Sequence, residues 1–159
     1  MSDLQTNLPA SPLSLQGKKG LILGIANDHS IAWGCARAAH LLGADIVATC
    51  LNDKARTYVE PLTKPLGIHL VNCDVENPQA LSELVDTAIS HLGHLDFVIH
   101  SIAWAPLEDL HAKVVDTSSA GFSRAMEVSC HSFASLAKLC APHMPQGGSL
   151  ITKIGRAHV

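Results

Sequence analysis

A run of small and polar residues in the first quarter of the chain has the composition of a phosphate-binding turn. It starts at Gly24, behind an apolar stretch, and ends near Ser30, where helical spacing sets in. A glycine at a strand end lets a ligand approach the backbone, and the N–H groups that open the next helix attract anions. The turn is longer than the strict G-x-G-x-x-G pattern. The residues therefore favour phosphate or dinucleotide binding over the alternative, an ordinary strand–helix turn.

Later strand ends carry further candidates. Leu51 follows the second expected strand, and Asp53 lies two residues after it, where an acid can bind a ribose, but a helix N-cap is the favoured interpretation of Asp53. Asp74 follows the third strand, where recognition of an adenine amino group and capping of a turn are both open. Small residues at 101–103 leave room for a ligand after the fourth strand, and Trp104 forms either an apolar wall or part of the core.

Two sets of residues resemble sites but are not expected to act as such. Tyr58 is the only tyrosine, and a Tyr/Lys pair can assist hydride transfer. It follows the second strand, however, and Pro61 separates it from Lys64. The ten histidines are scattered, and His91 and His94 lie on either side of a helix end, so no metal site is expected.

Apolar periodicity predicts the elements that position these residues. Short apolar runs predict strands at 20–24, 44–50, 68–73, 95–101 and 149–152. Helical spacing predicts helices at 30–42, 53–66, 78–92 and 118–140; Pro61 and Pro65 should break the second early. The inner face of the last helix should include Phe122, Met126, Ser129 and Leu136. The alternation predicts an α/β fold, a doubly wound parallel sheet of the Rossmann type with strand order 3-2-1-4-5.

Composition limits the class of protein. The 159 residues fit one domain, with residues 1–16 as a loose polar leader. A net charge of -3 and 4% aromatic residues argue against nucleic-acid binding. No run of about 18 apolar residues is present, so no membrane partner is expected. Five widely spaced cysteines predict reduced thiols and a cytoplasmic location.

In combination, these motifs resemble NADH-dependent enoyl-[acyl-carrier-protein] reductase, a divergent branch of the short-chain dehydrogenase/reductase superfamily. The resemblance rests on the turn G-I-A-x3-S-I-A-W-G at 24–34, C-D-V at 73–75 and H-S-I-A-W-A-P at 100–106. It extends over about residues 13–152. Another short-chain reductase is the enzymatic alternative, although such relatives usually carry an Asn-Ala-Gly type motif in place of residues 100–106. A non-catalytic dinucleotide-binding module is the alternative from another class.

The resemblance implies NADH as cofactor and a role for each of ten residues. The residues implied to bind the pyrophosphate and ribose are Gly24, Ile25, Ser30 and Ile31. Leu51 is implied to lie near the adenosine, Asp74 and Val75 around the adenine, Ser101 and Ile102 at the nicotinamide side, and Ala105 at the acyl substrate.

The implied reaction is reduction of the trans-2 double bond of an acyl-carrier-protein thioester in fatty-acid biosynthesis, with hydride passing from NADH to C3. In the family a Tyr and a Lys after the fifth strand assist this step, and the full-length relatives are homotetramers. This chain lacks the Tyr/Lys segment there, so residues 17–152 are expected to form a partial Rossmann domain, truncated after about the fifth strand. We expect this chain to be inactive as a reductase, prone to aggregate and not tetrameric.

Residues 153–159, K-I-G-R-A-H-V, depart from the family pattern. The same residues result when a common sequencing adapter is translated in one frame. We interpret them as a gene fragment read into adapter; the alternative is a natural truncated paralogue with a diverged tail.

Overall fold

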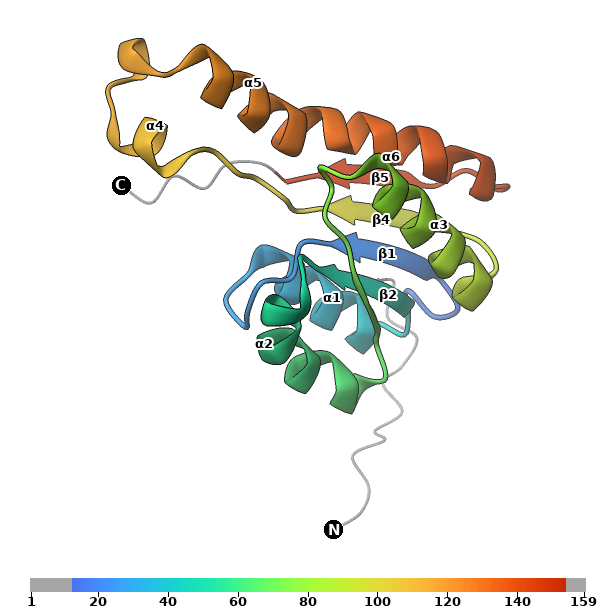
Figure 1. The fold of residues 1–159 in the computed structure, drawn as a ribbon. Helices are drawn as coiled ribbons and strands as arrows, with labels where there is room; N and C mark the ends of the chain where they lie inside the picture. Colours follow the sequence, from blue (N-terminus) through green and yellow to red (C-terminus); the bar gives the residue numbers. More distant parts are fainter. Residues whose placement is uncertain (1–12, 154–159) are drawn as a thin grey trace.

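The computed structural model describes residues 13–153. The leader expected at 1–16, apart from its residues 13–16, lies outside the described residues, and so does the tail expected at 153–159, apart from Lys153. The described residues form a twisted sheet with helices on both sides (Figure 1).

Strands and helices alternate along the chain. The strands are β1 Lys19–Leu23, β2 Asp45–Cys50, β3 His69–Asn72, β4 Phe97–His100 and β5 Ser149–Thr152. The helices are α1 Ile31–Leu41, α2 Asp53–Thr63, α3 Pro78–Leu92, α4 Leu107–His111, α5 Ser119–Met126 and α6 Ser132–Cys140. Shorter turns are η1 Lys64–Leu66, η2 Val114–Asp116, the π-helical turn η3 Glu127–His131, and η4 Ala141–His143. None of the helices in residues 13–153 has the length and apolar character needed to cross a bilayer.

All five strands are parallel and lie in the order β3-β2-β1-β4-β5, which confirms the predicted order. Strand β1 lies at the centre, where Gly20 pairs with Ile46 of β2 and with Phe97 of β4. The strand order reverses between β1 and β4, the place where ligands bind in open sheets of this type.

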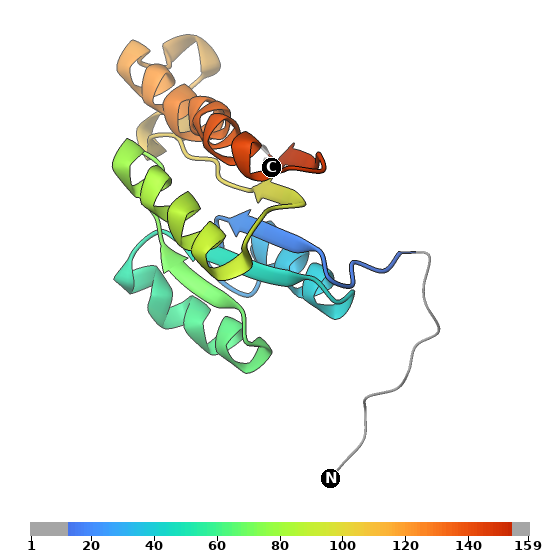
Figure 2. The ribbon, with the colours of Figure 1, turned by 90° about the vertical axis from the view of Figure 1, so that its right-hand side faces the viewer.

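Successive residues of β1 face opposite layers, as the two-residue period of a strand requires. Leu21 and Leu23 pack in the cluster that α3 and α6 cover, whereas Ile22 packs in the cluster that α1 and α2 cover. Figure 2 shows these two layers from the side. The buried faces on both sides account for the nearly continuous apolar sequence of the central strands.

Helix α2 runs through Pro61 to Thr63, so the predicted early break is wrong. Proline cannot donate the hydrogen bond that an α-helix directs to the carbonyl four residues earlier, here Thr57. Both Pro61 and Thr57 are exposed, so water can donate a hydrogen bond to the Thr57 carbonyl instead. Pro65 lies in the turn η1, beyond the end of the helix.

The predicted single helix at 118–140 is divided by the π-helical turn η3 into α5 and α6. The predicted inner face is wrong in the first half, because Phe122 and Met126 are 61% and 44% exposed. Ser129 and Leu136 are buried as predicted. A π-helical turn holds more residues than an α-helical one and therefore shifts the buried face. Helix α5 also continues past the end of the sheet (Figure 1).

Candidate functional site

A cavity of about 600 Å³ lies at the carboxyl edge of the sheet, where the chain leaves β1, β2, β3 and β4. Residues from these four strand ends and from the long helical segment form its lining. They are Gly24, Ile25, Ala26, Thr49, Leu51, Ala55, Cys73, Asp74, Val75, Glu76, Ser101, Ile102, Ala103, Trp104, Arg124 and Val128. Seven of the nine residues predicted to bind a cofactor are among them.

Gly24 brings two of the walls together. Its φ is +99°, a region that residues with a side chain rarely adopt. A Cβ there would collide with the carbonyl oxygen of Ser101 and crowd the Ile102 side chain. Thr49 fixes the bend from the other side: its hydroxyl accepts from Gly24 N–H (3.2 Å) and its carbonyl from Ile25 N–H (2.9 Å). Only glycine fits this position without displacing the neighbouring strand end.

The turn between β1 and α1 is held by its own polar side chains. The Ser30 hydroxyl donates to the Asn27 carbonyl (2.6 Å) and accepts weakly from Ala26 N–H (3.4 Å). No side chain caps the first N–H groups of α1, and its first turn contains no acidic residue. Ser30 and Ile31 lie at this helix start, outside the cavity lining. The N-terminus of α1 thus keeps donors for an anionic group.

The end of β2 differs from the prediction. Asn52, not Asp53, caps α2, because the Asn52 side chain accepts from Ala55 N–H (3.0 Å). Asp53 accepts a hydrogen bond from the Asn72 amide instead (2.6 Å). The Asp53 side chain therefore braces β3 against α2. Leu51 lines the cavity with 54% of its surface exposed.

The loop after β3 contributes acidic and apolar groups to the lining. One carboxylate oxygen of Asp74 accepts from Glu76 N–H (3.0 Å), which is the turn-capping role considered from the sequence. Val75 is buried against the core. Asp74 nonetheless lines the cavity, so the capping role does not remove it from the candidate site.

The segment after β4 forms the opposite wall. The backbone of Ser101 continues the pairing with β1, donating to the Leu23 carbonyl (3.1 Å). Trp104 lines the cavity and is 39% exposed, which favours the wall over the core interpretation. Ala105 is half-buried next to it, outside the lining.

Arg124 is the main residue of the lining that the sequence did not reveal. Its guanidinium donates two hydrogen bonds to the Glu76 carboxylate, at 2.7 and 2.9 Å, and lies 4.3 Å from the centre of the Trp104 ring. These hydrogen bonds lower the pKa of Glu76 and raise that of Arg124, so both groups stay charged. Glu76 and Arg124 are 48 positions apart, so no spacing rule connects them.

The remaining candidates lie outside this cavity. Tyr58 is 64% exposed on α2 and is absent from the lining. Within residues 13–153, no three His, Cys, Asp or Glu side chains are grouped closely enough to hold a metal ion. His69 and His91 stack at 4.7 Å on β3 and α3.

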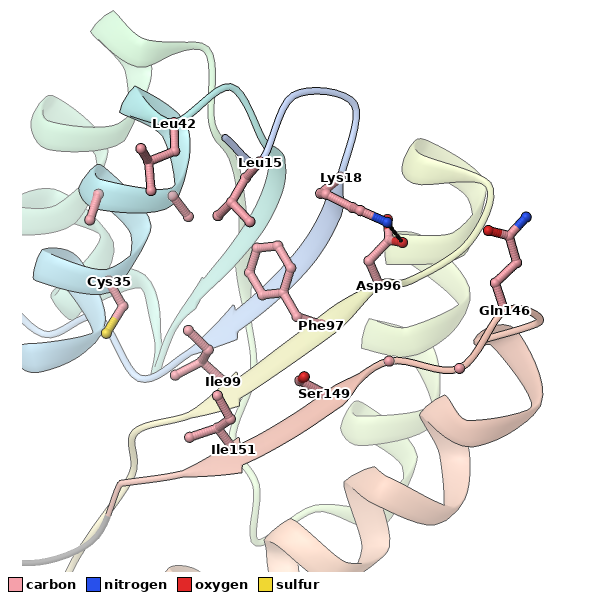
Figure 3. A pocket seen from close by; sticks show the side chains of 14 residues that line it. Leu15, Lys18, Cys35, Leu42, Asp96, Phe97, Ile99, Gln146, Ser149 and Ile151 are labelled. Atoms are coloured by element: carbon pink, nitrogen blue, oxygen red, sulfur yellow. Dashed lines mark hydrogen bonds and ion pairs between the residues drawn. The ribbon is translucent and has the colours of Figure 1, made fainter. Parts of the chain in front are cut away.

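A second cavity, of about 580 Å³, lies at the β5 side of the sheet, next to α1 (Figure 3). Its lining is mostly apolar and includes Leu42, Phe97, Ile99 and Ile151. Its charged side chains, Lys18 and Asp96, pair at 2.9 Å, and the Lys18 ammonium lowers the pKa of Asp96 although burial opposes this. The lining offers no arrangement of groups for chemistry.

Comparisons with known proteins identify relatives of this chain. Residues 24–154 match the family model described as Enoyl-(Acyl carrier protein) reductase. Enoyl-[acyl-carrier-protein] reductase [NADH] 2 of Rhizobium meliloti is 38% identical over 139 residues, covering 87% of this chain and 52% of the relative. The corresponding protein of a Nostoc species is 39% identical over 144 residues, covering 88% and 56%.

Solved structures give the same result. The enoyl-(acyl-carrier-protein) reductase of Anaplasma phagocytophilum, solved in complex with NAD, superposes with a TM-score of 0.82 at 38% identity, over 86% of this chain and 53% of that one. The Aquifex aeolicus enzyme gives 0.83 at 36% identity, over 87% and 55%. This chain therefore spans about half the length of the relatives that it matches.

Proposed function

The chain belongs to the enoyl-(acyl carrier protein) reductase family, and from this premise we propose that the cavity at the carboxyl edge of its sheet binds NADH. The observation that carries the proposal is the convergence of seven predicted cofactor residues, from four separate segments, on one cavity. The uncapped start of α1 beside it supplies the donors that a pyrophosphate needs. The relatives named NADH reductases and the neighbour solved with NAD support the same ligand.

The described residues fit such a ligand. Glycine at position 24 lets the end of β1 pack directly against the Ser101 carbonyl, and the cavity of about 600 Å³ lies against both residues. In the proposed arrangement, the residues toward the pyrophosphate and its ribose are Gly24, Ile25, Ser30 and Ile31. Those toward the adenosine are Leu51, Asp74 and Val75, and those toward the nicotinamide are Ser101 and Ile102. Ala105 is proposed to face the acyl group.

For the full-length protein we propose the reaction named for its relatives, reduction of an enoyl thioester on acyl carrier protein. Bound NADH supplies the hydride. The residues of this chain bind and orient the cofactor, and the apolar surfaces of Ile102 and Trp104 exclude water from one wall. Five free thiols, three of them buried, support a reducing compartment such as the cytoplasm.

We propose that this chain binds NADH without reducing enoyl thioesters. A group that stabilises the enolate oxygen is needed in the reaction, and the sole tyrosine, Tyr58, lies on α2 away from the cavity. The H-S-I-A-W-A-P stretch at 100–106 argues against a carbonyl reductase of the same superfamily, because such relatives usually carry an Asn-Ala-Gly type motif there.

Calorimetry with NADH and an assay of NADH oxidation with crotonyl thioester test the proposal together. Saturable binding without turnover is expected. Gly24→Val should abolish binding, whereas Gly67→Val, at an open position on the α2 side, should preserve it. Absence of binding by the folded chain would refute the cofactor site, and turnover would refute the assignment of binding alone.

A further inference from the structure

Residues 100–104 form one wall of the cavity. This wall is hydrogen-bonded at Trp104 to Ser129 of the π-helical turn η3 and at His100 to Ser132, the residue that follows the turn. We propose that Ser129, presented by this turn, is a positioning residue that holds Trp104 and the wall before it in place for the cofactor. The inference rests on the proposed function of the cavity, because the wall borders the space assigned to the nicotinamide.

Ser129 holds Trp104 through both polar groups of its backbone. The Ser129 hydroxyl accepts from Trp104 N–H at 3.0 Å and donates to the Trp104 carbonyl at 3.2 Å. Ser129 is 8% exposed, so water competes little for these bonds. One hydroxyl thus fixes the peptide groups on both sides of the Trp104 Cα, and with them the direction in which the indole leaves the backbone.

The flank of the turn anchors the other end of the wall. Ser132 N–H bonds to the Glu127 carbonyl, five residues earlier, as a π-helical turn requires. In an α-helix the Ser132 N–H would donate to the Val128 carbonyl. Here the Val128 carbonyl accepts a hydrogen bond from the Ser132 hydroxyl instead, at 2.6 Å. Since the hydroxyl proton is used there, the Ser132 oxygen accepts from Nε2–H of His100, at 2.8 Å.

The hydrogen bond to Ser132 defines the tautomer of the His100 ring. The ring carries its proton on Nε2 and leaves Nδ1 facing the Thr152 hydroxyl at 3.4 Å. His100 is fully buried, and burial lowers its pKa, which favours the neutral ring. The wall is therefore tied at His100 and at Trp104 to consecutive parts of one helical irregularity.

A purely structural role explains Ser132 but not Ser129. Serine in a helix often bonds back to a carbonyl of its own helix, and Ser132 does so. Both hydrogen bonds of Ser129 leave the helix and reach a residue that lines the cavity. Irregular π-helical turns occur frequently at functional sites, and here the turn places a hydroxyl where a loop needs both a donor and an acceptor.

The test uses the whole chain with Trp33→Phe, so that Trp104 is its only indole. Ser129→Ala should shift the Trp104 emission to longer wavelength, lower its anisotropy and weaken NADH binding about three- to tenfold, as expected for a lost hydrogen bond that positions the site. Far-UV circular dichroism should remain unchanged. Ser129→Thr keeps the hydroxyl and should restore both properties, and Ser123→Ala, an exposed serine on α5, is the matched control.

The outcomes separate the two proposals. If Ser129→Ala behaves like Ser123→Ala in emission and in affinity, the positioning role is wrong. If the parent chain folds but does not bind NADH, the proposed function fails. The positioning role is then judged by fluorescence alone: the same Trp104 emission in Ser129→Ala and in the parent would overturn it. If Ser129→Ala does not fold, the isosteric pair Ser129→Thr and Ser129→Val, which differ by the hydroxyl, decides the question by the same two readouts.

Discussion

The central carbon of the Arg124 guanidinium lies over the Trp104 ring, 4.3 Å from its centre, in a cation–π contact, while two hydrogen bonds of the same group go to Glu76. Arg124 thereby joins the loop after β3 to the segment after β4 across the cavity lining. The contact covers one face of an indole that is 39% exposed.

We predict that Arg124→Leu increases quenching of Trp104 fluorescence by the neutral quencher acrylamide, because the guanidinium no longer covers the ring. The Trp33→Phe background isolates the signal. Arg37→Leu, at an exposed position on α1, should leave the quenching constant unchanged. Equal quenching in the Arg124 variant and the parent would show that the contact is not populated in solution.

We predict that Gly24→Ala lowers the free energy of unfolding by about 2–4 kcal/mol, because backbone strain adds to a collision with the neighbouring strand end. Gly67→Ala is the matched control, since its φ is also positive, +67°, but nothing lies near the added Cβ. It should cost only about 1–2 kcal/mol of strain. Urea unfolding measures the free energy of unfolding of both variants. Equal decreases in the two would mean that the neighbouring strand end moves aside for the added Cβ at no energetic cost.

We predict that the chain loses stability as the pH falls below about 6.5. Burial lowers the pKa of His100 in the folded state, whereas the unfolded ring takes up a proton near pH 6.5. The unfolded state therefore binds more protons in that window, so stability is complete above it and decreases as the pH falls toward the folded pKa.

Urea unfolding between pH 5 and 7.5 checks this dependence. His100→Gln should flatten the slope of unfolding free energy against pH. His69→Gln should have a smaller effect, because His69, whose pKa is lowered first by desolvation and then by the charge of His91, is more exposed. If the unfolding free energy of His100→Gln depends on pH as steeply as that of the parent, other groups cause the dependence.

We predict that Ile151→Lys reduces aggregation of the chain. Strand β5 is the last strand of the sheet in residues 13–153, and Ile151 is 51% exposed beside the second cavity. A charge on an edge strand opposes pairing with another chain. Light scattering at rising concentration should show a later onset of assembly.

Leu150→Lys is the contrasting variant for that experiment. Leu150 packs against the cluster under α3 and α6, so a charge there should lower the free energy of unfolding by about 2–4 kcal/mol and promote aggregation. Similar behaviour of the two variants would show that the exposed face of β5 does not drive assembly.

The sheet could be predicted because its signals are local. Each central strand is a short apolar run, and glycines or proline mark most of the turns between elements. The parallel order then follows from the alternation of strands and helices. The positions of Gly24, Asp74 and Ser101 at one edge follow from the same rule, since parallel strands end on the same side.

The parts that the sequence concealed depend on contacts between distant residues. The π-helical turn has no composition of its own, because Ser129 and Ser132 fit an α-helix equally well by type. The Arg124–Glu76 pair joins segments that no periodicity relates. At the N-terminus of α2, Asn52 and Asp53 are both suitable caps, and the choice is decided by Asn72 on β3, which engages Asp53.

The reversal of strand order between β1 and β4 has a mechanical consequence. From Gly24 the chain departs toward the α1 and α2 layer, and from Ser101 it departs toward the layer of α3 and α6. A molecule seated between these two residues would act as a cross-brace between the layers. Its arrival should slow hydrogen exchange on both sides of the sheet together.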